Sequence, residues 1–253
     1  MQVHDKTFLI TGAASGLGAA TAERLVASGG RVVLCDLSDA VEAHVQRLGD
    51  PAMAMRGDVT SADDIQAAVK AAIALGGQLD GVVHCAGVVS VAKLLDRQGN
   101  PADLDAYART IQINLVGTFN VMRLAAAAMS TNAPSDDGER GVIINTASVA
   151  AFDGQVGQCA YSASKAGVVG MSLPAARELS RHGIRIMAIA PGVFETPMMS
   201  DIPEEAVASL SAAVPFPKRL GKPDEFARLA EQIITNSMLN GEVIRLDGGI
   251  RMQ

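Results

Sequence analysis

The chain has 253 residues, and because α/β folds of about this length commonly form one domain, we expect residues 1–253 to be a single domain. Hydrophobic residues make up 49% and aromatic residues only 3%, with no Trp, which predicts a core of Ala, Val, Ile, Leu and Met and excludes a disordered chain. The net charge of −6 argues against a nucleic-acid-binding module built on basic patches and aromatic side chains, so no nucleic-acid partner is expected.

The cysteines and the apolar runs bear on location. Cys35, Cys85 and Cys159 are too few and too scattered for a disulfide framework or a metal site, which indicates a reducing compartment and no metal. The first residues lack a basic segment followed by an apolar one, and no apolar run reaches about 18 residues. We therefore expect a cytoplasmic protein with no membrane partner.

Short apolar runs alternate with longer helical patterns along the whole chain. This alternation is typical of βαβ units and predicts a single-domain α/β fold, a doubly wound, Rossmann-type parallel sheet flanked by helices. Seven strands are predicted, at residues 7–11, 31–36, 52–58, 81–85, 141–146, 185–190 and 242–246. Helices are predicted at about 16–28, 62–75, 104–129, 160–182 and 224–236.

Two irregular stretches, 90–103 and 195–219, interrupt this alternation. Doubly wound folds bind ligands beyond the carboxyl ends of their strands, so long loops there are candidate walls of a substrate site. The alternative is that both are surface loops without function.

A glycine-rich turn follows the first predicted strand and opens the first helix. Gly12, Gly16 and Gly18 would let the backbone turn tightly and approach a pyrophosphate at the helix N-terminus. Asp36 ends the second strand, where a carboxylate can accept both ribose hydroxyls of NAD and would repel the 2′-phosphate of NADP. No Lys or Arg adjoins it in the sequence, so NAD is favoured; a cap for the next helix is the alternative for Asp36.

Small or acidic residues end the next two strands. Asp58 and Val59 close the third strand, and Cys85, Ala86 and Gly87 close the fourth. Because the carboxyl ends of parallel strands meet at one edge of a sheet, we expect these residues beside the same dinucleotide.

Asn114 and Ser148 are polar residues in otherwise apolar surroundings. Asn114 lies within a predicted helix between apolar neighbours, where a polar group needs a partner. A core Asn satisfied by local backbone is the alternative. Ser148 follows the fifth strand, where its hydroxyl could hold a carbonyl oxygen.

Tyr161 and Lys165 are four residues apart on one predicted helix and so share a face. An ammonium near a phenol lowers the phenol pKa, and such a Tyr can exchange a proton with an alcohol near neutral pH. An isolated pair of this kind is more often a half-buried Tyr with a Lys stem lying along the surface. Ser148 and Asn114 favour the catalytic interpretation here.

These residues together resemble the short-chain dehydrogenase/reductase family over essentially the whole chain. The motifs that carry the resemblance are the turn Thr11–Gly18, Asn114, Ser148, Tyr161 with Lys165, and Pro191-Gly192 followed by Thr196. The resemblance implies that Ser148 binds the substrate oxygen, Tyr161 is the acid/base, and Lys165 holds the nicotinamide ribose and lowers the pKa of Tyr161. It also implies that Asn114 orders a water in a proton relay.

The same resemblance implies a cofactor site and a substrate site. The cofactor residues would be Gly12, Ser15, Gly16, Leu17, Gly18, Asp36, Asp58, Val59, Cys85, Ala86, Gly87, Tyr161, Lys165, Pro191, Phe194 and Thr196. Gln155 and Gln158 lie just before Tyr161 and are expected to line the substrate site with Ser148.

Within the family, the two long loops and residues 239–253 look like those of members that act on acyl-CoA substrates. The implied reaction is hydride transfer between NAD(H) and a secondary alcohol or ketone, a 3-hydroxyacyl-CoA/3-ketoacyl-CoA pair in fatty-acid or branched-chain oxidation. Lys93, Arg97, Lys218 and Arg219 could then meet the CoA phosphates. A homotetramer is also implied.

Two alternative functions remain open. One is oxidation of a hydroxysteroid or another hydrophobic secondary alcohol. The other, of a different class, is a non-catalytic scaffold that binds a dinucleotide.

Two residues depart from the family pattern. His84 stands where the family usually has Asn; a structural His is favoured over a general base, because Tyr161 already fills that role. Glu195 replaces a small residue, and its carboxylate could disfavour a CoA phosphate.

Overall fold

Seven parallel strands form one sheet in the computed structural model, which describes residues 1–199 and 204–252. The strand order is β3-β2-β1-β4-β5-β6-β7. The strands are β1 (Thr7–Thr11), β2 (Arg31–Asp36), β3 (Ala52–Arg56), β4 (Gly81–His84), β5 (Gly141–Thr146), β6 (Ile184–Pro191) and β7 (Val243–Leu246). The order reverses between β1 and β4, as in a doubly wound fold, so the predicted Rossmann-type sheet is confirmed.

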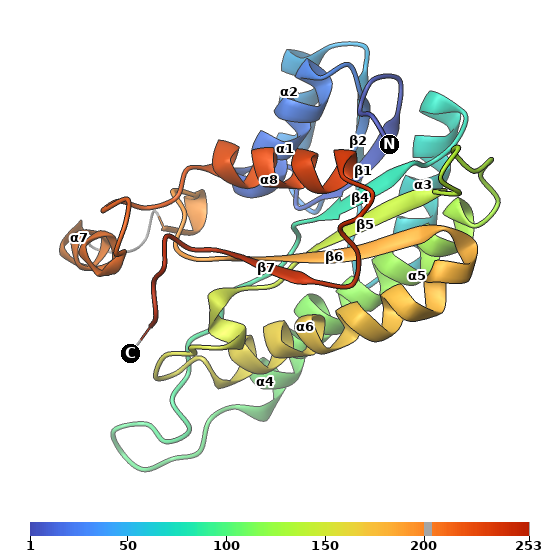
Figure 1. Cartoon of the computed structure of the whole chain (residues 1–253). Helices are drawn as coiled ribbons and strands as arrows, with labels where there is room; N and C mark the ends of the chain where they lie inside the picture. Colours follow the sequence, from blue (N-terminus) through green and yellow to red (C-terminus); the bar gives the residue numbers. More distant parts are fainter. Residues whose placement is uncertain (200–203, 253) are drawn as a thin grey trace.

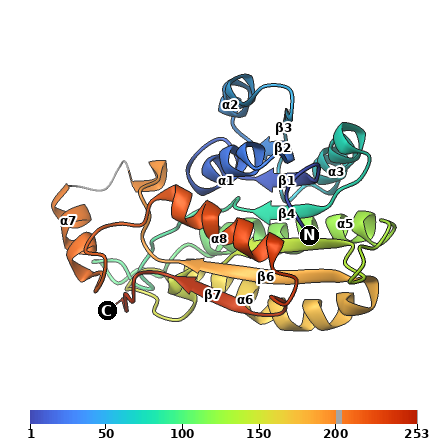
Figure 2. The same cartoon turned by 45° about the horizontal axis from the view of Figure 1, so that its top comes forward.

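Helices cover both faces of the sheet (Figure 1, Figure 2). One face carries α1 (Gly16–Ala27), α2 (Ala40–Leu48) and α8 (Pro223–Thr235). The other carries α3 (Ala62–Gly76), α4 (Leu104–Ile111), α5 (Gly117–Met129) and α6 (Cys159–Leu179). The remaining helix, α7 (Glu204–Ala213), stands apart from both layers, beyond the carboxyl ends of β6 and β7 (Figure 1).

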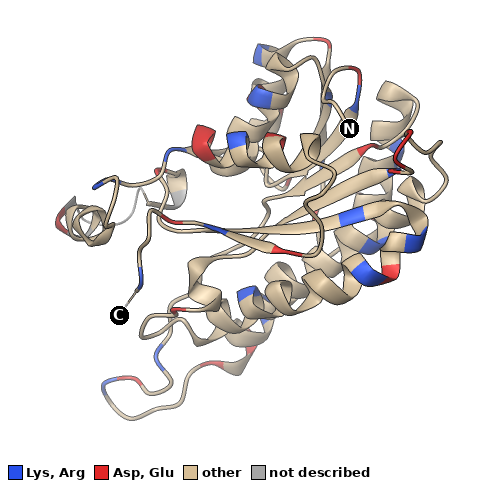
Figure 3. Ribbon diagram, in the orientation of Figure 1, with Lys and Arg blue, Asp and Glu red and all other residues tan. Residues whose placement is uncertain are grey.

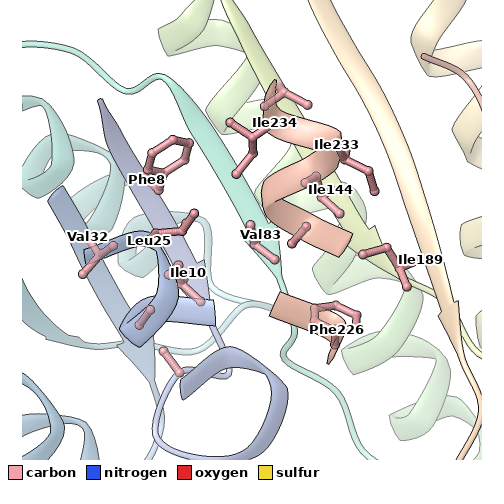
Figure 4. Packing of buried hydrophobic residues seen from close by; sticks show 14 of the residues in the cluster. Phe8, Ile10, Leu25, Val32, Val83, Ile144, Ile189, Phe226, Ile233 and Ile234 are labelled. Carbon is pink, nitrogen blue, oxygen red and sulfur yellow. The ribbon is translucent and has the colours of Figure 1, made fainter. Parts of the chain in front are cut away.

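The core is aliphatic, as the composition predicts. Figure 4 shows the layer between the sheet and helices α1 and α8, where Phe8 and Ile144 of the sheet lie near Leu25 and Phe226. All four side chains are fully buried. Charged residues lie mostly on the outer faces of the helices and in the loops, and the sheet is largely free of them (Figure 3).

The predicted helix 104–129 is divided in the structure. A π-helical turn over Gln112–Val116 separates α4 from α5 and contains Asn114. Such turns accommodate one extra residue and are frequent at functional sites, and a hydrophobic period cannot predict them. The bonds that Asn114 makes to another element, described below, supply the physical reason.

Two helices were not predicted. α2 buries only Val41 and His44, so its apolar pattern is weak. α7 lies within the stretch 195–219 that the sequence indicated as irregular, and residues 200–203 of that stretch lie outside the described residues. A bridge between Phe194 and Gly221 joins the two ends of the stretch.

Gly12 allows the turn after β1 to approach the segment after β4. Its φ is 65°, in the left-handed region, and a Cβ built on it would lie 2.6 Å from the backbone nitrogen of Ala86. No side chain fits there, so the glycine is required for the shape of this edge of the sheet.

Candidate active site

A cavity of about 450 Å³ lies at the carboxyl ends of the strands on the β1 side of the sheet. It is lined by the glycine-rich turn between β1 and α1 and by the ends of β2, β3 and β4. The predicted cofactor residues that line it are Gly12, Ser15, Gly16, Leu17, Gly18, Asp36, Asp58, Val59, Cys85, Ala86, Gly87 and Thr196. The fold therefore brings the first turn of the chain and the segment after β6 to one cavity.

Asp36 faces the glycine-rich turn. Its Oδ2 accepts a hydrogen bond of 3.0 Å from the backbone N–H of Ala14, and its Oδ1 accepts one of 2.9 Å from the backbone N–H of Ser38. The residue at the N-cap of α2 is Asp39. Asp36 is therefore positioned at the cavity, and the alternative of a helix cap is not what the structure shows.

A basic residue does lie beside Asp36, contrary to the expectation from its sequence neighbours. Arg56 on β3 is the register partner of Asp36 on β2. Its guanidinium is directed to Asp39, with an Nη1–Oδ1 distance of 3.0 Å, and both of these side chains are exposed. Pairing between strands, which cannot be read from adjacent residues, places this charge there.

A second cavity of about 250 Å³ adjoins the first. The two share the lining residues Leu17, Cys85, Gly87, Val88 and Thr196. All the other predicted site residues except Asn114 line the second cavity: Ser148, Gln155, Gln158, Tyr161, Lys165, Pro191 and Phe194. The predicted dinucleotide and substrate sites are thus neighbouring cavities with a common wall.

Ser148, Tyr161 and Lys165 converge in the second cavity. The Ser148 and Tyr161 side chains are hydrogen-bonded, and Ser148 Oγ also accepts from the backbone N–H of Ala150 at 3.1 Å. Lys165 Nζ lies 5.8 Å from the centre of the Tyr161 ring and donates to the carbonyl of Thr146 at 2.8 Å. The Tyr161 hydroxyl, which can donate or accept a proton, and the Lys165 ammonium thus lie together in the cavity that shares a wall with the first.

The pKa of Tyr161 is raised in the protein by burial, and the hydrogen bond from Ser148 opposes this. In the folded chain by itself, Lys165 does not lower the pKa of Tyr161, contrary to the expectation from the sequence. The physical reason is that burial also lowers the pKa of Lys165, to about 8, so the ammonium has already lost its proton at the higher pH at which the Tyr161 phenol ionises.

Asn114 lines neither cavity and is completely buried. Its Oδ1 accepts from the backbone N–H of Val88, and its Nδ2 donates to the Val88 carbonyl, both at 2.8 Å. Nδ2 also donates to Ser164 Oγ at 3.1 Å. Its partners belong to other elements rather than to local backbone, and they fix Val88, which lines both cavities. A role in a proton relay stays a prediction.

His84 is a buried residue of the central sheet. Its Nδ1 lies 2.7 Å from Thr11 Oγ1, and burial, together with the nearby Lys165 charge, lowers its pKa to about 3. A neutral imidazole hydrogen-bonded across two strands agrees with the structural role that the sequence favoured. Glu195 is exposed at the start of the 195–219 stretch.

Several residues that line the cavities were not predicted from the sequence, because they belong to no recognisable motif. In the first cavity they include Arg109, Gln112 and Ile113, at the junction of α4 and the π-helical turn, and in the second they include Leu210 and Met252. The position of the first three on the same helical stretch as Asn114 could have indicated them. Nothing in the sequence indicates Met252, because tertiary packing alone brings the end of the chain to the cavity.

Cys35, Cys85 and Cys159 are free, and burial raises the pKa of Cys35 and of Cys85 to about 12.

Among residues 1–199 and 204–252, no group of three His, Cys, Asp or Glu side chains is arranged to hold a metal ion. Within the same residues no helix has the length and apolar character needed to span a membrane. A cytoplasmic location stays a prediction.

Comparison with known proteins identifies the family. Residues 6–206 match the family model described as short chain dehydrogenase. A relative named 3-hydroxyacyl-CoA dehydrogenase type-2, from Drosophila melanogaster, is 54% identical over 246 residues, which cover 96% of each chain. The crystal structure of 3-hydroxyacyl-CoA dehydrogenase type-2 from Mycobacterium avium is 46% identical, with a TM-score of 0.94 over 98% of this chain and 96% of that one.

A second solved structure adds a cofactor-bound neighbour. It is described as 3-ketoacyl-(acyl-carrier-protein) reductase from Brucella melitensis complexed with NADH, and it is 29% identical with a TM-score of 0.86 over 98% of both chains. The resemblance inferred from the motifs is thereby confirmed, and the chain belongs to the short-chain dehydrogenase family.

Proposed function

We propose that the chain is an NAD-dependent dehydrogenase that interconverts 3-hydroxyacyl-CoA and 3-ketoacyl-CoA thioesters. The observation that carries the proposal is the convergence of Ser148, Tyr161 and Lys165 in a cavity that shares a wall with the glycine-rich dinucleotide cavity. Relatives at about half identity over nearly the whole chain are named for this reaction. The predicted fatty-acid or branched-chain oxidation would use the oxidative direction.

The glycine-rich turn fits a dinucleotide. A Cβ built on Gly18 would lie 2.3 Å from the carbonyl oxygen of Gly12, so only glycine lets the start of α1 pack this closely against the turn, and a pyrophosphate would bind at that helix N-terminus. Asp36, at the edge of the same cavity, would accept the ribose hydroxyls of NAD. The NADH complex of the Brucella melitensis neighbour supports the same choice of cofactor.

The bound nicotinamide supplies the hydride acceptor or donor. In alcohol oxidation, Tyr161 Oη takes the proton of the substrate hydroxyl, and Ser148 Oγ holds the same oxygen by a hydrogen bond. Lys165, anchored on the Thr146 carbonyl, would hold the nicotinamide ribose with its ammonium and stabilise the phenolate. In ketone reduction, Tyr161 returns the proton. Asn114 orders the wall through Val88.

The substrate cavity suits an acyl chain. Its walls carry mostly apolar side chains, among them Val149, Leu210 and Met252, and Gln155 and Gln158 are the polar residues that we assign to substrate binding. Arg219 is unsuited to a CoA phosphate, because its guanidinium forms two hydrogen bonds to Glu225, of 2.7 and 2.9 Å. Lys93 and Arg97 are exposed and remain candidates.

One assay separates the proposed function from both alternatives. We expect NADH oxidation to be faster with acetoacetyl-CoA than with a keto-steroid, because the active site combines a compact cavity with the family's acid/base residues. Faster turnover of the keto-steroid would favour the hydrophobic-alcohol alternative. NADH binding by fluorescence titration without turnover of any ketone would show a non-catalytic scaffold.

We further propose that the chain forms a homotetramer. Large apolar side chains are exposed along α4, the π-helical turn and α5: Leu104 is 75%, Tyr107 40%, Val116 41% and Phe119 51% exposed. Burial of this face against another copy would remove apolar surface from water. Sedimentation at micromolar concentration should give a tetramer, and a stable monomer would contradict the proposal.

The dinucleotide cavity and the substrate cavity are built by elements from both ends of the chain, from the turn after β1 to the segment after β7. This supports our proposal that residues 1–253 act as one domain, with 195–219 as the substrate loop. Thr196, Met199 and Leu210, in the described part of that stretch, line the substrate cavity.

A further inference from the structure

Arg245 on β7 joins three segments at one wall of the substrate cavity. Its Nη2 donates to Asp153 Oδ2 at 2.6 Å and to the Ile250 carbonyl at 3.1 Å, and its Nε donates to Asp247 Oδ2 at 2.8 Å. The guanidinium carbon also lies 5.2 Å from the centre of the Phe152 ring. One side chain therefore holds the loop before α6, the end of β7 and the C-terminal segment.

The first partner, Asp153, belongs to the loop that leads to Gln155 and Gln158, which both line the substrate cavity. The two glutamines are ordered with respect to each other, because Gln155 N–H donates to Gln158 Oε1 at 3.0 Å. This bond leaves the amino group of the Gln158 amide free to turn toward the cavity. A change in the position of Asp153 would therefore move the Gln155 and Gln158 amides in the cavity.

The second partner, the Ile250 carbonyl, belongs to the segment that carries Met252 into the cavity. Ile250 is 1% exposed and packs with Val149 and Val214. In Figure 1 this segment runs from the end of β7 toward the C-terminus. The packing holds Ile250 in place, and the Arg245 bond ties it to the opposite loop.

The chemistry of the guanidinium suits this task. The Arg245 side chain is 22% exposed, Asp153 20% and Asp247 8%, so the ion pairs are largely shielded from water. A planar fork can bond several acceptors at once, which an ammonium or an amide cannot do in the same geometry. Neighbouring Arg251 also bonds Asp247, at 3.2 Å, and the Ile250 carbonyl, at 2.7 Å, but its side chain is 61% exposed and these partners belong to its own segment rather than to the loop before α6.

We propose that Arg245 is a specificity-determining positioning residue, which sets the distance between the Gln155–Gln158 loop and the Met252 segment and thereby the acyl groups that the cavity accepts. The proposal rests on the proposed function in naming acyl groups. Arg245 does not line either cavity and acts through its partners.

Kinetics of Arg245→Gln with a series of 3-ketoacyl-CoA thioesters of increasing chain length tests the proposal. Loss of hydrogen bonds made by a charged group typically costs about 1.5–3 kcal/mol, so we expect KM for the best thioester to rise about 10- to 100-fold. The ranking of chain lengths should change, and KM for NADH should stay within about twofold. Arg251→Gln, which removes an arginine from the same cluster without touching Asp153, should leave the ranking unchanged.

Asp153→Ala provides an independent variant if Arg245→Gln folds poorly. It removes the carboxylate that Arg245 bonds in the loop and leaves the bonds of Arg245 to Asp247 and Ile250, and it should reproduce the altered ranking with an unchanged KM for NADH. An unchanged ranking in either folded variant would overturn the proposal, and so would an equal rise in KM for NADH and for the thioester.

Hydrogen exchange separates this proposal from the proposed function. In Arg245→Gln we expect faster exchange in both residues 152–158 and 249–252, because one side chain ties the two segments. Unchanged exchange in either segment would overturn the proposal, whatever the substrate proves to be. If the wild-type protein turned over no acyl-CoA, the proposed function would be contradicted. Hydrogen exchange would still test the role of Arg245, because it does not depend on the substrate.

Discussion

Replacement of Tyr161 by Phe is expected to lower kcat for both alcohol oxidation and ketone reduction by about 10²- to 10⁴-fold, the usual contribution of a general acid/base. The ring and its packing on α6 remain, so NADH binding measured by fluorescence should change little. In the wild type the pKa of Tyr161 is raised by burial, so the rate of alcohol oxidation should increase with pH as the phenolate forms. Steady-state rates over a pH series measure both effects.

The second tyrosine supplies a matched control. Tyr107 lies on α4, 40% exposed and outside the lining of both cavities. Tyr107→Phe removes the same hydroxyl from the same kind of side chain, and its kcat and pH profile should equal those of the wild type. Near-normal turnover of Tyr161→Phe with the best substrate would refute the assignment of the acid/base.

Replacement of Asp36 by Asn is expected to reverse much of the preference for NAD over NADP. A full negative charge about 4 Å from a phosphate costs on the order of 1–4 kcal/mol, depending on solvent screening, and the ribose hydroxyls also lose an ionic acceptor. The ratio of kcat/KM for NAD to that for NADP should therefore fall by roughly 10- to 10³-fold. Arg56, beside Asp36 in the sheet, is paired with Asp39 and would have to leave this partner to meet the 2′-phosphate.

Asp58→Asn is the control for this cofactor prediction. Asp58 lines the same cavity, and its Oδ1 accepts from the N–H and the hydroxyl of Thr60, both at 2.8 Å. It follows a different strand, β3, where it would flank the adenine ring that both cofactors contain. Its loss should weaken NAD and NADP alike and keep their ratio. An unchanged ratio in Asp36→Asn would show that another group selects the cofactor.

The positions of the strands along the chain and the edge of the sheet that holds the site follow from local patterns. Buried parallel strands appear in a sequence as short runs of β-branched residues. The turn after β1 has a backbone conformation and close contacts that glycine meets and residues with a side chain rarely do. Gly12 is an example, since its backbone conformation and its contact with Ala86 both exclude a side chain. The amino-acid sequence alone therefore suffices to assign such residues to a dinucleotide site.

The sequence could not determine features that depend on partners far along the chain. The π-helical turn at Asn114 depends on bonds to Val88, which are invisible to helical periodicity. The charge of Arg56 beside Asp36 depends on pairing between β2 and β3. The pKa of Tyr161 depends on how deeply the folded chain buries it, and burial reversed the direction that the spacing to Lys165 indicated.

By itself the sequence determined the doubly wound fold and predicted which residues the fold would bring to one edge of the sheet, because glycine conformations, strand patterns and the spacing of Tyr161 and Lys165 are local properties. Only the tertiary structure decided the shape of the substrate cavity. Its walls come from the loop before α6, from α7 and from the C-terminal segment, and Arg245 holds the first and last of these together. The reason is physical: side-chain hydrogen bonds and packing between distant segments exist only after the backbone has folded.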